Sequence, residues 1–191
     1  FEQMNMKIIH QILRFLILLP VSMKATKSVV FKEGDELITV SGDLLIAEDA
    51  QDELDFEQAQ KLAFKQGDMD VPNLGISKSA FWIKLELENN SFEEDLLLEL
   101  SLPILDEVTF YYPVGGQYKR IKTGEAFVFS HRKYQEPNYL FDLDLKHGDS
   151  KVYFLKVKSS EAIQLPVKIG TRAALTDQIK NRDILSGIYF G

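Results

Sequence analysis

The chain has 191 residues, of which 45% are apolar and 27% are charged; this is ordinary for one folded domain with a sizeable core and excludes a disordered chain. Its 22 basic and 29 acidic residues give a net charge of −7, which argues against nucleic acid as the main partner. Because the sequence has no cysteine, disulfides, thiolate catalysis and Cys-based zinc or iron–sulfur sites are excluded.

The beginning of the chain has the layout of a secretory signal peptide. A charged start at Lys7 precedes an apolar segment that is continuous from Phe15 to Leu19, and the small residue Ala25 stands where cleavage is expected. Arg14 interrupts the apolar segment, so an amphipathic helix packed on the domain is the alternative. We predict a signal peptide over residues 1–25 and export of the chain. The sequence contains no apolar run of about 18 residues, so it predicts no complete membrane helix within these residues.

From residue 28 the chain mostly alternates between apolar and polar residues, which is the period of a strand with one buried face. The clearest alternation runs from Phe81 to Glu88, and another runs from Phe141 to Lys146. Leu96–Leu100 and Val108–Tyr112 are more continuously apolar, as expected of strands covered on both faces. Further strands are expected at Val29–Phe31, Leu37–Val40, Leu44–Ala47, Val152–Val157 and Ile163–Ile169. About nine or ten strands at this spacing predict an all-β, two-sheet sandwich of the jelly-roll type.

One short helix is expected within this β-domain. Asp55 is a good N-cap residue, and Gln58 stands at the third helical position, where its side chain can complete a capping box. The apolar face consists of Ala59, Leu62 and Ala63. Gly67 is a natural end for this helix.

The C-terminal part is expected to be helical as well. Leu175, Ile179 and Ile184 have the spacing of a loosely amphipathic helix. The segment Gly187–Gly191 places aromatic residues next to glycines, which is common where a chain enters a membrane interface. We therefore divide the exported chain into a sandwich domain over residues 26–176 and a juxtamembrane segment over 177–191 that leads to a membrane helix.

The patterns that mark metal sites and catalytic sites do not occur. The histidines are not paired at the spacings that bind transition metals; they are His10, His131 and His147. The acidic stretch from Glu48 to Asp55, and the pair Asp142 and Asp144, lack the spacing of a calcium loop, so a solvated acidic surface is the alternative. Neither a G-x-S-x-G elbow nor a glycine-rich phosphate loop is present. We assign no metal, no cofactor and no catalytic residue to this domain.

Aromatic and cationic residues are the candidates for ligand binding. Trp82, the only tryptophan, lies on the strand face opposite Phe81 and Ile83, so it either packs against a second layer or offers its ring to a ligand. The segment from Phe127 to Tyr134 joins aromatic residues with a cationic group that includes Arg132. Aromatic faces stack on sugars, and arginine donates in a fork to hydroxyls or carboxylates; core packing and a structural ion pair are the alternatives.

Several motifs follow one another in a recognisable order. They are Gly75 with Ser77, Phe81–Leu85, Leu105–Tyr111, Gly124, Arg132, Phe141–Leu143, Tyr153–Val157 with Ser159, Leu165–Val167 and Gly187–Gly191. This ordered set, which spans roughly Leu37 to Gly191, resembles the second type of extracellular domain of bacterial seven-transmembrane receptors with diverse intracellular signalling modules. Lys156 stands where an arginine is frequent in that family.

The resemblance implies a jelly-roll, carbohydrate-binding-like domain on the periplasmic or extracellular side of the inner membrane. Seven membrane helices and a cytoplasmic output module, such as a histidine kinase or a diguanylate cyclase, would follow it. The implied ligand is a carbohydrate or a related small molecule, by analogy of fold. Trp82 and Arg132 match recurrent positions of the family, and we predict them as ligand contacts together with Tyr134 and Tyr139. A carboxylate beside Arg132 would favour neutral sugars, whereas a free Arg132 would favour sugar acids.

We therefore expect a sensory domain whose ligand alters the packing of the C-terminal segment and so biases the membrane helices. The alternative is a module that forms a homodimer or meets a periplasmic partner through a sheet edge or an apolar patch. A carbohydrate-active enzyme, recognisable by two facing carboxylates in a deep cleft, is the third hypothesis. The expected partners are a small molecule and the membrane, and not nucleic acid.

Overall fold

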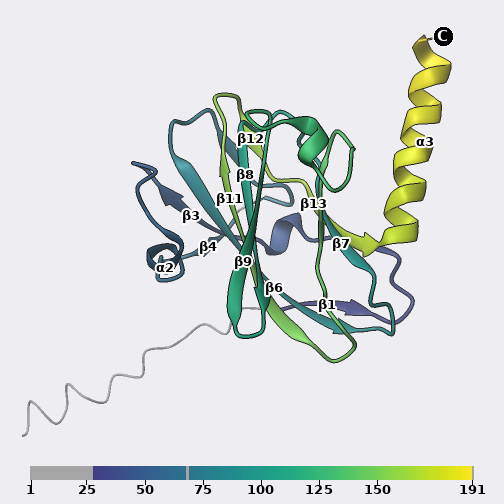
Figure 1. The fold of residues 1–191 in the computed structure, drawn as a ribbon, viewed down its shortest axis with the longest axis horizontal. Helices are drawn as coiled ribbons and strands as arrows, with labels where there is room; N and C mark the ends of the chain where they lie inside the picture. Colours follow the sequence, from purple (N-terminus) through teal and green to yellow (C-terminus); the bar gives the residue numbers. More distant parts are fainter. Residues whose placement is uncertain (1–27, 68, 191) are drawn as a thin grey trace, which may run out of the picture.

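Two mostly antiparallel β-sheets form the molecule in the computed structural model, which describes residues 28–67 and 69–190 and the side chains as far as Asn181. The ribbon in Figure 1 shows the strands of the two sheets packed against each other, with one long helix along the side. The predicted all-β sandwich is therefore confirmed. The predicted signal peptide over residues 1–25 lies outside the described residues.

The larger sheet has seven strands in the order β4-β3-β6-β11-β8-β9, and β1 pairs with β6 in parallel beside β3. These strands are β1 (Val29–Lys32), β3 (Leu45–Asp49), β4 (Lys65–Gln66), β6 (Ala80–Asn90), β8 (Glu107–Val114), β9 (Gln117–Thr123) and β11 (Ser150–Lys158). Since β9 ends the order, one edge of this sheet is formed by a strand whose seven residues are mostly exposed.

The smaller sheet has four strands in the order β10-β7-β13-β2, and β10 is one of its edges. Its members are β2 (Leu37–Thr39), β7 (Leu96–Leu100), β10 (Tyr139–Asp142) and β13 (Val167–Thr171), while β5 (Asn73–Gly75) and β12 (Ile163–Gln164) form a separate pair. The chain passes from the edge strand β9 to the edge strand β10 through residues 124–138, which include the short 3₁₀ helix η2 (Phe129–His131). A second 3₁₀ helix, η1 (Ser41–Asp43), follows β2.

The core lies between the inner faces of the two sheets. The apolar alternation predicted in β6 supplies one wall, and its inward residues are at most 6% exposed: Phe81, Ile83, Leu85 and Leu87. All five residues of β7 are buried, as predicted for a strand covered on both faces. Inside the core, the Phe110 ring lies between Phe141 and Tyr153, at centroid distances of 4.6 and 5.8 Å.

The first α-helix is shorter than predicted. Helix α2 covers only Phe56–Ala59, although its predicted capping box is present, with Asp55 accepting from the Gln58 N–H at 2.8 Å. The expectation that the helix continues to Gly67 is wrong, because Lys65 and Gln66 pair with β3 as the edge strand β4. The residues between them form turns that place Leu62 and Phe64 against the outer face of the larger sheet.

The C-terminal helix α3 (Arg172–Phe190) follows β13 directly and runs back along the side of the sandwich and beyond it (Figure 1). It begins at Arg172 because the Thr171 hydroxyl accepts a hydrogen bond from the Ala174 N–H at 3.1 Å, as an N-cap residue does. Leu175 and Ile179 are buried, at 1% and 8% exposure. In the described part of the chain, no helix is both long and apolar enough to span a bilayer.

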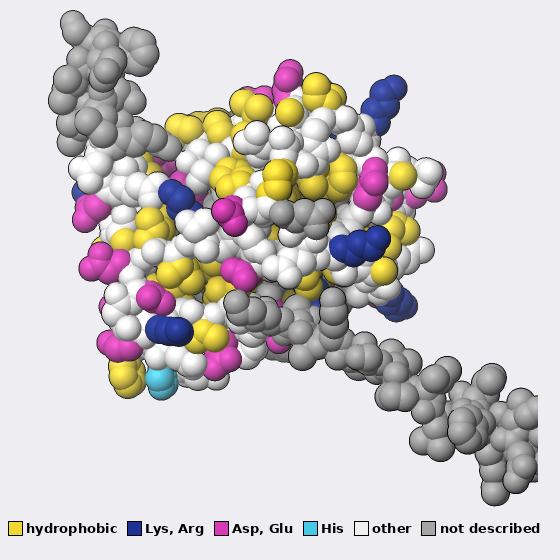
Figure 2. Space-filling view, turned by 180° about the vertical axis from the view of Figure 1, so that it is seen from behind, with side chains coloured by type: hydrophobic (Ala, Val, Ile, Leu, Met, Phe, Trp, Pro, Cys, Tyr) yellow, Lys and Arg dark blue, Asp and Glu magenta, His cyan; other side chains and the backbone are white. Residues whose placement is uncertain are grey.

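The surface carries charges of both signs. Figure 2, which views the molecule from behind, shows acidic, basic and hydrophobic side chains interspersed over this face. The large hydrophobic residues that are at least 45% exposed all lie outside the strands; they are Met69, Ile76, Phe92, Val128 and Phe129. Val128 and Phe129 are neighbours in the connection between β9 and β10, so this connection exposes an apolar segment.

Candidate functional site

A cavity of about 110 Å³ opens between the edge strands β9 and β10, beneath the connection over residues 124–138. Its apolar lining includes Ile121, Phe127 and Val128, and its polar lining includes Thr123, Arg132, Lys133, Tyr134, Asn138 and Asp142. Three of the four predicted ligand contacts, Arg132, Tyr134 and Tyr139, line this cavity. The edge of the sandwich between β9 and β10 therefore holds most of the candidate site.

Arg132 fastens the connection onto itself. Its guanidinium nitrogens donate to three backbone carbonyls, those of Glu136 at 3.2 Å, Pro137 at 3.1 Å and Gly124 at 3.3 Å. The same guanidinium lies over two aromatic rings, 4.9 Å from the centre of Phe129 and 4.6 Å from that of Tyr139. Arginine suits this position because its flat fork can donate to several acceptors while its face packs on a ring.

The guanidinium of Arg132 bonds backbone carbonyls of the protein and forms no ion pair with a described carboxylate. Among the described residues, no carboxylate forms an ion pair with it, and its Nε is the one guanidinium nitrogen that is buried without a hydrogen-bond partner. The ion-pair alternative considered for Arg132 is thus replaced by bonds to backbone carbonyls. These bonds use three of the five guanidinium N–H groups and leave the one on Nε and one on Nη2.

Tyr139 is a buried wall of the cavity. It is 1% exposed, and its hydroxyl donates to the carbonyls of Pro103 at 2.8 Å and Leu105 at 2.9 Å. Burial raises the pKa of its hydroxyl. Tyr139 thus presents only its ring, already covered by Arg132, toward the site.

The neighbouring Asn138 closes the floor of the cavity. Its amide donates to the carboxyl group of Glu99 at 2.6 Å, and both side chains are buried. In the described part of the chain, the second carboxyl oxygen of Glu99 has no hydrogen-bond partner. The sequence drew attention to neither residue, because a polar residue in an apolar strand has no partner that spacing identifies.

The base of the connection depends on a glycine. Gly124 has φ of 137°, and a Cβ added there would lie 2.1 Å from the Asp106 carbonyl oxygen. This close approach lets the N–H groups of Glu125 and Ala126 donate to Leu105 and Asp106, at 2.9 and 3.0 Å. The connection therefore starts from a fixed point at the end of β9.

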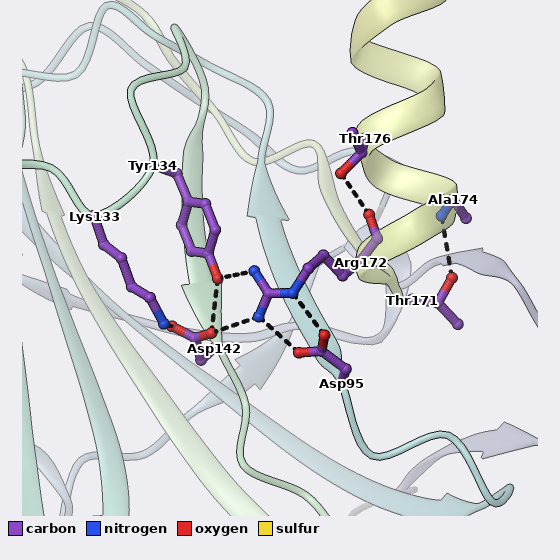
Figure 3. Close-up of polar contacts among 8 residues, drawn as sticks. All are labelled: Asp95, Lys133, Tyr134, Asp142, Thr171, Arg172, Ala174 and Thr176. Atoms are coloured by element: carbon purple, nitrogen blue, oxygen red, sulfur yellow. Dashed lines mark hydrogen bonds and ion pairs between the residues drawn. The ribbon is translucent and has the colours of Figure 1, made fainter.

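Tyr134 belongs to a cluster of polar side chains that reaches the C-terminal helix (Figure 3). Its hydroxyl donates to Asp142 at 2.7 Å and accepts from the guanidinium of Arg172, the first residue of α3. Asp142 also accepts from Lys133 at 2.7 Å and from Arg172 at 3.1 Å. Arg172 in turn donates twice to Asp95, at 2.6 Å each. The cavity wall and the start of α3 are thus joined by hydrogen bonds.

The cluster shifts the acidity of its members. Burial opposes ionisation of Asp142, but the hydrogen bonds from Lys133, Tyr134 and Arg172 outweigh it and lower its pKa below the ordinary 3.8. The hydrogen bonds from Arg172 lower the pKa of Asp95, and the bond to Asp95 raises the pKa of Arg172. Burial is the first cause that raises the pKa of Tyr134. Both carboxylates are therefore ionised at neutral pH.

Trp82 lies away from this cavity, on the outer face of the larger sheet. It is fully buried beneath Phe56, which is stacked on Tyr111 with a centroid distance of 4.2 Å. The Lys156 ammonium lies 5.2 Å from the Trp82 ring centre and bonds Asp52 at 2.6 Å. Of the two arrangements considered for Trp82, packing against a second layer is the one present. The role of Trp82 as a ligand contact stays a prediction.

A polar groove lies beside this second aromatic cluster. It is lined by Asp52, Asp55, Phe56, Glu107, Thr109, Tyr111, Arg120, Lys122, Lys156 and Lys158, among others. Asp52 bonds both Lys156 and Lys158, at 2.6 and 2.7 Å, and Asp55 caps α2. Within the described ranges, no group of three or more His, Cys, Asp or Glu side chains is arranged to hold a metal ion. Asp142, considered for calcium, is bonded to cations and a phenol.

Comparison with known proteins agrees with this architecture. The model of one protein family, described as 7TMR-DISM extracellular 2, matches residues 41–171, which run from η1 to the end of β13. A comparison with curated proteins gives no match. The matched region covers most of the chain and includes the whole cavity wall. The chain belongs to the 7TMR-DISM extracellular 2 family, and it is an extracellular sensory domain of a transmembrane receptor.

Proposed function

We propose that this domain senses a small molecule, a carbohydrate or a related compound, in the cavity between β9 and β10. The observation that carries the proposal is that two residues lining the cavity each hold a buried polar atom without a partner. Thr123 is 7% exposed, and neither its hydroxyl nor the Nε of Arg132 has a hydrogen-bond partner among the described residues. Because buried polar groups are normally paired, a ligand that bonds them would relieve their cost.

The remaining lining suits a ligand with a polar edge and an apolar face. Ile121, Phe127 and Val128 lie on the apolar side, at 40%, 37% and 60% exposure, and can cover the C–H face of a sugar ring. Three N–H groups of Arg132 are occupied by backbone carbonyls, so fewer donors are left for a ligand than a free arginine offers. The remaining Nε donor can serve a sugar hydroxyl or a sugar carboxylate, so the screen includes both classes.

The domain is proposed to act without catalysis. Of the described residues that line the cavity, only Asp142 is a carboxylate, and it accepts hydrogen bonds from three side chains. Glycoside hydrolysis by the usual mechanism requires two carboxylates across the scissile bond. The family also places the chain outside the cytoplasm, and we propose the periplasmic side of a bacterial inner membrane, with residues 177–191 leading toward a membrane helix.

A thermal-shift screen of the 191-residue chain against neutral mono- and oligosaccharides and uronic acids tests the proposal. A ligand at 100 times its dissociation constant stabilises by about 2.7 kcal/mol, which corresponds to several degrees. Thr123→Val removes only the unpartnered hydroxyl, so it should keep the fold and reduce the shift. Thr109→Val is the matched control, because Thr109 is equally buried on the other face of the same sheet. Loss of the shift in both variants, or in neither, would count against this cavity.

A protein-interaction module is the second candidate function. Phe127, Val128 and Phe129 are consecutive and all at least 37% exposed, which is typical of a contact surface. Sedimentation equilibrium of the wild-type chain and of Val128→Asp distinguishes the two functions. A homodimer that Val128→Asp dissociates, with no shift for any sugar, would favour the interaction module.

A further inference from the structure

We propose that the cluster of Tyr134, Asp142, Arg172 and Asp95 couples the state of the cavity to the attachment of helix α3. The inference rests on the proposed function, because it explains how an occupied cavity is communicated to the end of the domain. The cluster is drawn in Figure 3, where Tyr134 and Arg172 point toward each other from the connection and from the base of α3.

The coupling starts at Tyr134. Of the four cluster residues, Tyr134 and Asp142 also line the cavity. Its hydroxyl has two roles, as donor to Asp142 and as acceptor from Arg172. A ligand that displaces the Tyr134 ring must lengthen or realign both bonds. Tyr134 and Arg172 are 38 positions apart in the chain, so no local secondary structure supplies the hydrogen bond between them.

The coupling ends at Arg172, which fixes the first turn of α3. Its backbone N–H donates to the Asp95 carbonyl at 3.0 Å, and its guanidinium holds the Asp95 carboxylate with two bonds of 2.6 Å. The guanidinium is therefore divided among Asp95, Asp142 and Tyr134. When one acceptor moves, the geometry available to the others changes, and so does the position of the helix start.

Helix α3 has few other attachments in its described part. Leu175 and Ile179 are its buried apolar residues, and Lys168 donates to Gln178 at 3.3 Å. An element held by so few contacts opens locally at a low free-energy cost. The Arg172 cluster thus contributes a large share of what holds residues 172–181 of α3 on the sandwich, and a change at Tyr134 is transmitted to this part of the helix.

Amide hydrogen exchange on the 191-residue chain tests the coupling without a ligand. Tyr134→Phe keeps the ring in the cavity wall but removes the hydroxyl, and it should accelerate exchange across 172–181 by roughly three- to ten-fold, the equivalent of one hydrogen bond. Tyr118→Phe is the matched control, since its hydroxyl donates to the Val152 carbonyl at 3.0 Å on the other side of the sheet. Amides of β6 provide the internal reference for global stability.

Coupling must also act in the opposite direction, because it is reciprocal. Asp95→Asn, which does not touch the cavity, should accelerate exchange of the loop amides of Phe127, His131 and Arg132, which are bonded within the connection. Asp149→Asn is the control, as Asp149 pairs with Lys151 at 3.3 Å away from the cluster. If each variant affected only its own end, the two sites would be uncoupled and the inference would be overturned. That result would not bear on ligand binding, which the thermal-shift screen with sugars tests separately.

Discussion

The guanidinium of Arg132 lies 4.6 Å above the ring centre of Tyr139 while its nitrogens hold three backbone carbonyls of the β9–β10 connection. Stacking and bonding occur together because the group is flat and carries its donors in one plane. Arg132, which the sequence predicts as a ligand donor, therefore fixes the connection that forms part of the cavity wall.

Arg132→Lys should loosen this connection. Lysine keeps the charge but cannot stack as a plane or reach several carbonyls, so we expect the free energy of unfolding to fall by about 2 kcal/mol. Urea denaturation of the two proteins measures the difference. Arg120→Lys, on the exposed face of β9, should change stability by less than about 0.5 kcal/mol. Equal effects of the two substitutions would contradict a structural role for Arg132.

Gly124→Ala should displace the whole connection. The added Cβ would lie 2.1 Å from the Asp106 carbonyl oxygen, and the backbone φ of 137° is unfavourable for alanine. We expect a loss of at least about 2 kcal/mol of stability and the loss of any sugar-induced thermal shift. Gly116→Ala separates the two causes, because Gly116 has φ of 79° but nothing within 4 Å of the added Cβ. A Gly124→Ala protein as stable as the Gly116→Ala protein would refute the close approach.

Trp82 should behave as a core residue. Trp82→Ala should reduce the free energy of unfolding by about 3–5 kcal/mol, because it leaves a large void under Phe56. As the sole tryptophan and fully buried, it should also resist quenching by iodide. A ligand in the cavity should leave its fluorescence unchanged. A strong ligand-induced change would instead support the prediction that Trp82 is a ligand contact.

Acid should weaken the attachment of α3. The pKa values of Asp95 and Asp142 are lowered by folding, so their stabilising contribution is fully present above the ordinary value of 3.8 and is lost as the pH falls through the lower folded values. We expect Asp142→Asn to lose stability at pH 7 and to show a flatter decline below about pH 4 than the wild-type chain. Urea titrations at pH 7, 4 and 3 measure both slopes, and parallel declines would contradict the assignment of Asp142.

Much of the fold could be predicted because strand patterns are local. The alternation from Phe81 to Glu88 assigns a buried face to β6, and the apolar run from Leu96 to Leu100 indicates a strand covered twice; both are confirmed. The length of α2 could not be predicted, because its capping box fixes where it begins, whereas pairing of Lys65 and Gln66 with β3 decides how the chain continues.

The candidate site divides in the same way. The sequence by itself determined the family, the sandwich and the mixture of aromatic and cationic residues from Phe127 to Tyr134, since these depend on residue type and order. Only the tertiary structure decided that Trp82 is covered, that Arg132 bonds backbone carbonyls, and that Arg172 meets Asp95. A carbonyl acceptor carries no residue signature, and a pair 77 positions apart is selected by the packing of two sheets and a helix, which no local spacing encodes.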